Sequence, residues 1–160
     1  ARVGKLMVVD SLPFIGLLFG PATTVDMVRP QAAALQTAFA ARNYAEIDDR
    51  TAQTMSATDE GRARVRDWTR TADAKVSAQL FYDGMTTDIR PELPAITAPL
   101  TMLYPFDAKV MSADTVDRLY KAAFAPAKTA TLVRVDDSRH FMMVDQPITF
   151  AAAVDAFLAK

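Results

Sequence analysis

Three short apolar runs, separated by segments of helical pattern, constrain the fold of this chain more than any other feature. They lie at residues 6–9, 100–104 and 131–135. The first is apolar on both faces, which is typical of a parallel strand covered by helices. Strands that alternate with helices predict a parallel sheet with right-handed crossovers. A length of 160 residues indicates one domain, and the alternation of strands and helices indicates the α/β class.

A long helical insertion, residues 13–93, separates the first strand from the second. Ala32, Leu35 and Phe39 share one helix face, and Pro30 fits the first turn of that helix or a kink in it. A second helical stripe is expected along Val65, Trp68, Ala72 and Val76. We therefore divide the chain into a core-sheet strand (1–12), the insertion (13–93) and the remaining core (94–160).

The second half of the core reads as strand, helix, strand and helix. Residues 91–99 carry three prolines and are expected to form a connector. The strand at 100–104 should end where Pro105 begins the turn. Ser112 is expected to cap an amphipathic helix, and Pro147 suits the first turn of the last helix.

Three residues with catalytic potential each follow the end of an expected strand: Asp10, Asp107 and His140. Ligands of parallel sheets gather at the carboxyl ends of the strands. A neutral imidazole is the natural general base near neutral pH, and a carboxylate that holds its second ring nitrogen improves it. From spacing alone, a lone loop histidine such as His140 is more often an incidental residue than a catalytic one.

Composition excludes several other kinds of site. The chain has no cysteine, one histidine and a formal net charge of −1. Disulfides, thiolate catalysis and cysteine-based zinc sites are therefore excluded, and no basic surface suggests nucleic acid. No apolar run reaches the roughly 18 residues that span a bilayer. We expect no cofactor.

Three motifs resemble the C-terminal half of the α/β-hydrolase superfamily. Residues 2–10 resemble its sixth strand, and residues 98–107 its seventh strand with the acid at the end. Residues 137–141, followed by Asp145-Gln146-Pro147 and a terminal helix, are similar to the histidine loop and last helix. Residues 13–93 then correspond to the cap. The chain departs from the family where Tyr104 and Arg139 stand, since the family often has glycine at both positions.

The resemblance implies that His140 is the general base and Asp107 the catalytic acid, with Asp10 as the rival acid because some relatives place it after the sixth strand. The order of Asp107 before His140 agrees with the family. The family's nucleophile lies in G-x-S-x-G, and none of the serines of this chain has that pattern. Ser11 and Ser138 lie near strand ends, but each suits a turn or cap.

The implied function is a serine hydrolase, esterase-like, that cleaves small or medium carboxylic esters or related acyl compounds. The nucleophile and oxyanion hole would come from the N-terminal half, as a separate chain or a preceding segment. The chain begins with Ala1 and almost at once enters a strand, so we expect something to precede it; the compartment stays undetermined. The alternative is a non-catalytic binding or interaction domain with a hydrolase-like fold.

Overall fold

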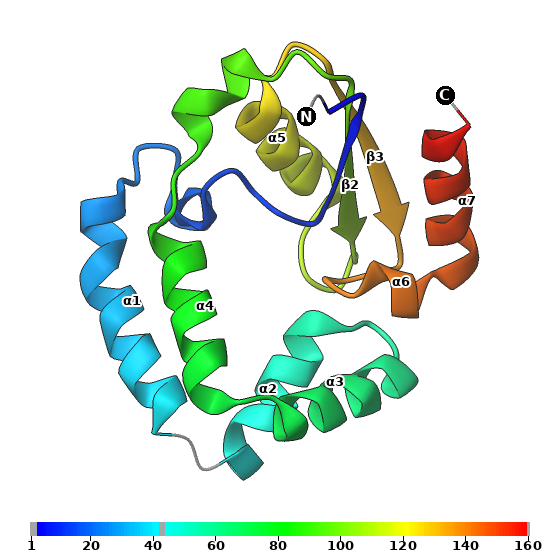
Figure 1. Cartoon of the computed structure of the whole chain (residues 1–160). Coiled ribbons are helices and arrows are strands. Elements are labelled where there is room, and N and C mark those ends of the chain that lie inside the picture. The colour runs from blue at the N-terminus through cyan, green and yellow to red at the C-terminus, as the bar shows by residue number, and fades with distance from the viewer. Residues whose placement is uncertain (1–2, 42–43, 160) are drawn as a thin grey trace.

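A three-stranded parallel sheet forms the core of the computed structural model, which describes residues 3–41 and 44–159 (Figure 1). Ala1 and Arg2, the start of the first motif, lie outside the described residues, as do residues 42 and 43 of the insertion. The strands are β1 (Leu6–Val9), β2 (Leu100–Phe106) and β3 (Ala130–Asp136), in the order β1-β2-β3. Leu6 is in register with Leu100, and Leu100 with Ala130. The expected parallel α/β core is confirmed.

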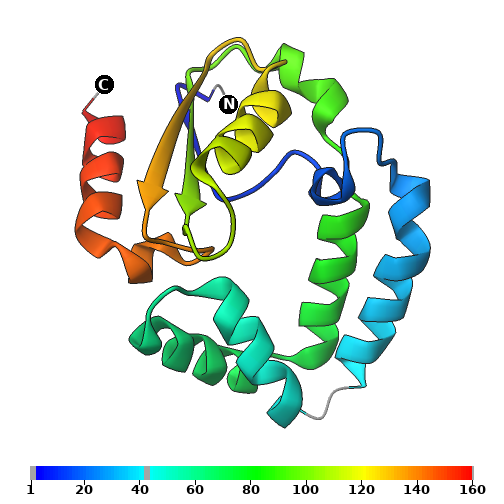
Figure 2. The ribbon, with the colours of Figure 1, turned by 180° about the vertical axis from the view of Figure 1, so that it is seen from behind.

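Helices cover the two faces of this sheet. Leu100, Met102 and Tyr104 pack on α5 (Ala113–Phe124) through Val116 and Tyr120. The opposite face contributes, among others, Leu103, Val135 and Met7, with α7 (Pro147–Leu158) beside it. Figure 2 shows α5 and α7 on opposite sides of the strands. The alternation along β2 is the two-residue period of a strand that is buried on both faces.

The second strand is longer than its sequence indicates, and the expected break at Pro105 is wrong. Pro105 pairs with Val135 in register, inside β2. The Leu103 carbonyl accepts from the Asp10 amide, so the backbone groups of Leu103, and of Pro105 two residues on, point toward β1. Because β1 ends at Val9, the missing N–H of Pro105 falls where no strand among the described residues needs a donor.

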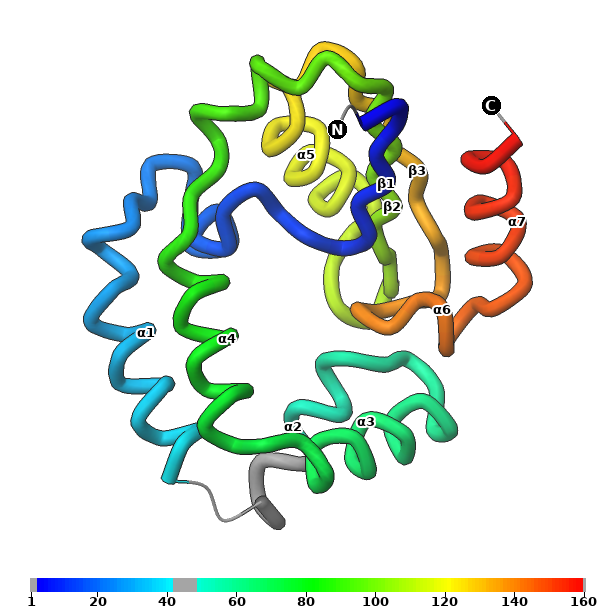
Figure 3. Tube along the Cα trace, in the orientation of Figure 1, coloured from blue at the N-terminus to red at the C-terminus, as the bar shows by residue number. Residues whose placement is uncertain are grey.

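The insertion folds as a series of helices that curve away from the sheet and return to it (Figures 1 and 3). They are the 3-10 helix η1 (Ile15–Phe19), α1 (Val25–Ala40), α2 (Tyr44–Met55), α3 (Asp59–Thr71), α4 (Ala74–Thr86) and the 3-10 helix η2 (Arg90–Ala95). Helices α1 and α4 lie side by side in all three views. Helices α2 and α3 lie at the carboxyl end of the sheet.

Three details of the insertion and the connector after it differ from the sequence prediction or refine it. Residues 65–76 do not form one stripe, because α3 ends at Thr71 and Asp73 caps the new helix α4 by accepting from the Lys75 and Val76 amides. An aspartate is one of the preferred residues at such a cap. Part of the expected connector at 91–99 is also ordered, as η2. Pro30 lies inside α1, one turn beyond its start.

The two helix-start predictions in the core are confirmed. Ser112 accepts from the Thr115 amide at the start of α5, and Pro147 occupies the first turn of α7. Between β3 and α7, the chain forms an additional short helix, α6 (Met142–Asp145). Helix α7 packs loosely on the sheet, since Leu158 is exposed and none of its residues is fully buried.

Candidate functional site

His140 lies in the loop after β3 and contacts Asp10, which follows β1. The imidazole Nδ1 is 2.8 Å from Asp10 Oδ2. The histidine side chain is 45% exposed and that of Asp10 is 15% exposed. An ionised carboxylate only accepts hydrogen bonds, so the ring nitrogen that faces it must be the donor. The remaining nitrogen, Nε2, is then the one available as a base.

Asp10 is held at three points, one on its backbone and two on its carboxylate. Its amide donates to the Leu103 carbonyl at 2.9 Å, and its backbone adopts a positive φ of 42°. Aspartate tolerates this left-handed conformation better than most residues, because its short polar side chain can bond locally. Oδ1 accepts from the hydroxyl of Tyr120, and Oδ2 faces His140. Each carboxylate oxygen therefore has its own partner.

Asp107 follows β2 and is engaged elsewhere. Its Oδ2 accepts from Arg139 Nε at 2.8 Å, and its Oδ1 from the Lys109 amide at 2.9 Å. The side chain is 10% exposed. Burial raises the pKa of Asp107, but the Lys109 amide and the Arg139 guanidinium outweigh it, so that the pKa lies below its usual value. The carboxylate is thus a stable anion.

The expected contact between His140 and Asp107 is therefore wrong for this structure. The loop after β3 presents Arg139 to Asp107 and the next residue, His140, to Asp10. A guanidinium is always charged and binds carboxylates strongly, so it competes directly with the imidazole. The signal was visible in the sequence, because Arg139 stands where the resembled family often has glycine. Asp10, the rival acid, is the carboxylate that the structure brings to His140.

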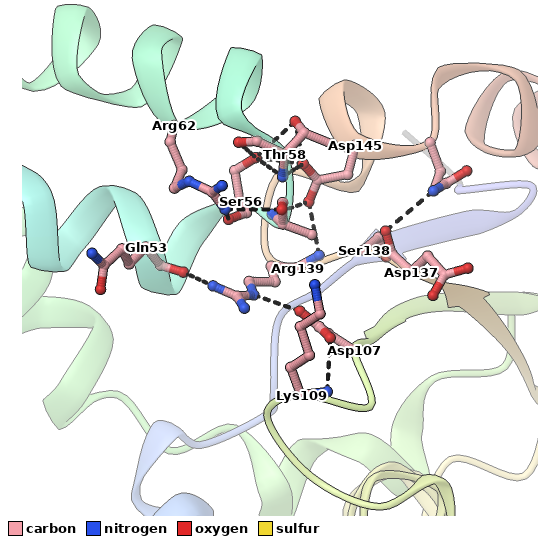
Figure 4. Close-up of polar contacts among 12 residues, drawn as sticks. Gln53, Ser56, Thr58, Arg62, Asp107, Lys109, Asp137, Ser138, Arg139 and Asp145 are labelled. Atoms are coloured by element: carbon pink, nitrogen blue, oxygen red, sulfur yellow. Dashed lines mark hydrogen bonds and ion pairs between the residues drawn. The ribbon is translucent and has the colours of Figure 1, made fainter.

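Asp145 is a buried residue of this region, and its sequence position indicates only that it lies near the start of the last helix. It accepts from Ser56 Oγ, from the Ala57 amide at 2.9 Å and from Thr58 Oγ1 at 3.1 Å (Figure 4). It also accepts from the Arg139 amide at 2.9 Å. Burial raises the pKa of Asp145, but these donors together lower it below its usual value. Nothing in the sequence pairs positions so far apart.

These bonds dock the corner between α2 and α3 onto the histidine loop. Arg139 adds a bond from its guanidinium to the Gln53 carbonyl, and the Phe141 amide donates to the Met55 carbonyl at 2.9 Å. Figure 4 shows Arg139 between Asp107 and Gln53. The helical insertion is thus joined to the sheet beside the candidate base.

One aromatic residue of the insertion reaches this loop. Trp68 of α3 meets Phe141 edge to face at 5.2 Å between ring centroids, and Phe141 meets His140 at 5.0 Å. Phe14 and Met85, two apolar residues of the insertion, are buried within the insertion itself. Of the residues after the histidine, Met142 is fully buried under the sheet.

The serines near the site have structural partners or face solvent. Ser138 is 1% exposed and donates to the Val135 carbonyl at 2.7 Å. Ser56 is buried on Asp145, and Ser11 is exposed. Within residues 3–41 and 44–159, no cluster of His, Asp or Glu has the arrangement of a metal site. No helix in that part of the chain is long and apolar enough to cross a bilayer.

At the level of sequence, no family model and no curated protein matches the chain. Solved structures do match. An esterase from Exiguobacterium antarcticum has a TM-score of 0.76 at 15% identity over 100% of this chain and 59% of its own. An esterase from Thermogutta terrifontis has a TM-score of 0.73 at 15% identity, covering 99% of this chain and 56% of its own. The enol-lactonase from Burkholderia xenovorans has a TM-score of 0.69 at 17% identity, covering 99% and 57%.

The fold of this chain is that of the C-terminal portion of an α/β-hydrolase. The chain is covered almost completely by each of these structures, yet it spans less than two thirds of their length. At such low sequence identities, the structural likeness establishes the architecture alone, and the function depends on the residues of the site.

Proposed function

We propose that this chain is the C-terminal part of a serine hydrolase that cleaves small or medium carboxylic esters or related acyl compounds. The observation that carries the proposal is the His140–Asp10 pair at the carboxyl edge of the sheet, with Nδ1 and Oδ2 at 2.8 Å. A base held by a carboxylate, at the edge where parallel sheets bind ligands, is the arrangement that nucleophilic acyl transfer needs. The esterase and lactonase folds found among similar structures agree with this chemistry.

In the proposed reaction, His140 Nε2 takes the proton of a serine hydroxyl as the serine oxygen bonds to the acyl carbon. The imidazolium then donates that proton to the departing alcohol oxygen, and a water molecule later releases the acid by the same route. Asp10 holds the ring and stabilises its cation. The exposed histidine leaves Nε2 accessible for this exchange.

Asp107 is retained as the second candidate acid. Its place after β2 is the position that the resemblance assigns to the acid, but in this geometry it can serve His140 only after it leaves Arg139. The proposal therefore gives Asp10 the orienting role in the observed arrangement. Asp107 then acts mainly on structure, by holding Arg139 and through it the Gln53 carbonyl of the insertion.

The serine and the oxyanion hole would come from the N-terminal half of the hydrolase, docked along β1. The Leu6 and Asp10 amides face β2, where they donate to the Pro99 and Leu103 carbonyls. Because successive backbone groups alternate in direction along a strand, the amides of Met7 and Val9 face the outer edge, which no described strand pairs. Such an edge is a template for another strand.

Hydrogen exchange of the β1 amides tests this partner. Met7 and Val9 should exchange fast in the 160-residue chain and become protected when the half that carries the G-x-S-x-G sequence is added. Leu6 and Asp10 are the matched controls and should be protected in both states. No change at Met7 and Val9 in an assembled, active protein would contradict docking along this edge.

Turnover of p-nitrophenyl acetate tests the reaction. The chain alone should show only background hydrolysis, and supplying the nucleophile-bearing half should restore turnover that His140→Ala abolishes. Assembly without turnover would favour the alternative, a non-catalytic binding domain with a hydrolase-like fold. Hydrolysis by the chain alone that is lost in His140→Ala would reveal a nucleophile within these 160 residues.

A further inference from the structure

The Asp10 carboxylate has a second, buried partner on the far side from the histidine. The Tyr120 hydroxyl donates to Asp10 Oδ1, while Oδ2 faces His140 Nδ1 at 2.8 Å. Tyr120 is 6% exposed. One carboxylate therefore joins a buried phenol to an exposed imidazole, and the orientation of the carboxylate depends on both contacts.

Packing holds the phenol in place. Tyr120 belongs to the face of α5 that lies against the sheet, and its ring stacks on Tyr104 of β2 at 4.6 Å with an interplanar angle of 24°. The Tyr104 hydroxyl points to another acceptor and donates to Asp117 at 2.9 Å. Neither ring can turn without disturbing the stack, so the hydroxyl of Tyr120 has little freedom to leave Asp10.

Tyr120 also remains a donor at every pH at which an esterase works. Burial, followed by the nearby Asp10 carboxylate, raises the pKa of Tyr120 far above the ordinary value of a phenol. The pKa of Tyr104 is raised to about 12, mainly by burial and by its bond to Asp117. Both rings are thus neutral, and only one of them reaches the carboxylate beside the base.

We propose that Tyr120 is a positioning residue, which locks the Asp10 carboxylate against His140 so that the neutral imidazole carries its proton on Nδ1 and leaves Nε2 free. With the phenol in place, Oδ1 is engaged and Oδ2 stays directed at the ring. Without it, the carboxylate can rotate and shares its time between the ring and solvent. The relevance to catalysis rests on the proposed function, but the effect on the tautomer does not.

The test uses the single histidine of the chain, which makes its ring nitrogens unambiguous in a ¹⁵N NMR spectrum. At a pH where the ring is neutral, the unsubstituted chain should show mainly the Nδ1–H tautomer. In Tyr120→Phe, the ratio of Nδ1–H to Nε2–H should fall by roughly fivefold, which corresponds to losing about 1 kcal/mol of the preference for the Nδ1–H tautomer. Asp10→Asn sets the limit reached when the carboxylate is removed.

Tyr104→Phe is the matched control, because it changes the other ring of the stack in the same way but leaves Asp10 untouched. Its tautomer ratio should equal that of the unsubstituted chain. An unchanged ratio in Tyr120→Phe, or an equal fall in Tyr104→Phe, would overturn the proposal.

A second measurement does not require Tyr120→Phe to fold. In the unsubstituted chain, the Tyr120 hydroxyl proton should exchange slowly enough to give its own resonance, and Asp10→Asn should shift that resonance. Its absence in the unsubstituted chain, or its insensitivity to Asp10→Asn, would also overturn the proposal. A confirmed tautomer effect without ester hydrolysis in the assembled protein would remove the proposed function and leave the positioning role intact.

Discussion

Two carboxylates end neighbouring strands of the same sheet, and their surroundings give them different roles. Asp10 ends β1 and shares its oxygens between a neutral phenol and an imidazole. Asp107 ends β2 and shares its oxygens between an arginine and a backbone amide. A position at the carboxyl edge of the sheet therefore brings a carboxylate close to the candidate site, but its hydrogen-bonding partner sets whether it can orient the histidine. The Arg139 guanidinium binds Asp107 as a permanent cation, whereas Asp10 faces the imidazole of His140.

The two carboxylates should differ most in their effect on activity. In the assembled protein, we expect Asp10→Asn to lower kcat/KM for a p-nitrophenyl ester by roughly 10³–10⁴-fold, the loss typical when a histidine base is left in the wrong tautomer. Asp107→Asn should lower it by less than about tenfold, because it removes a contact to Arg139 rather than to the base. Steady-state kinetics on both variants checks this. The reverse ranking would restore Asp107 as the acid.

Asp145 holds the residue that binds Asp107. It accepts from the Arg139 amide and from the corner between α2 and α3. Asp145→Asn replaces an acceptor by a group that carries donors, which face the existing donors of Ser56 and Ala57. We expect the free energy of unfolding to fall by about 2–3 kcal/mol, measured by urea denaturation. Asp59→Asn, at a side chain that is 99% exposed, is the control and should change it by less than about 0.5 kcal/mol. Equal effects would show that Asp145 does not join the two parts.

Removing the Arg139 cation tests whether Asp107 can take over the role of Asp10. In an Asp10→Asn background, Arg139→Gly frees the Asp107 carboxylate, which then can turn to His140. We expect about a tenfold recovery of kcat/KM relative to Asp10→Asn alone, equal to roughly 1.4 kcal/mol. The triple variant that also carries Asp107→Asn should lose the recovery. Recovery that persists in the triple variant would mean that Arg139 acts in some other way.

The smallest expected effect is on the pH dependence of stability. The folded pKa of Asp107 lies below its usual value, so its ion pair stabilises the fold above the unfolded pKa of about 3.9 and the stabilisation is lost as pH falls through the folded pKa. The unsubstituted chain should therefore lose more stability between pH 5 and pH 3 than Asp107→Asn does. Urea midpoints at the two pH values measure it. Asp26→Asn, at a 92% exposed side chain, should resemble the unsubstituted chain, and a matching loss in Asp107→Asn would contradict the role of the ion pair.

Much of the fold could be predicted from local patterns. The three strands, the cap at Ser112, the first-turn proline at Pro147 and the amphipathic α5 follow from periodicity and start signals that act within a few residues. The prediction that β2 ends at Pro105 was wrong. A proline destabilises a strand only where a neighbouring strand needs its N–H as a donor, and β1 is too short to need one there. The prediction of one helical stripe across residues 65–76 was wrong because Asp73 caps a new helix.

The candidate site divides in the same way. The sequence predicts that Asp10, Asp107 and His140 share one edge of the sheet, because parallel strands align their carboxyl ends. Only the tertiary structure decided which carboxylate meets the histidine, since His140 lies 130 residues from Asp10 and Arg139 lies 32 residues from Asp107. Arg139 and His140 are adjacent and compete for the two carboxylates: the guanidinium binds Asp107, while the Asp10 carboxylate, which also accepts from Tyr120 of α5, faces the imidazole.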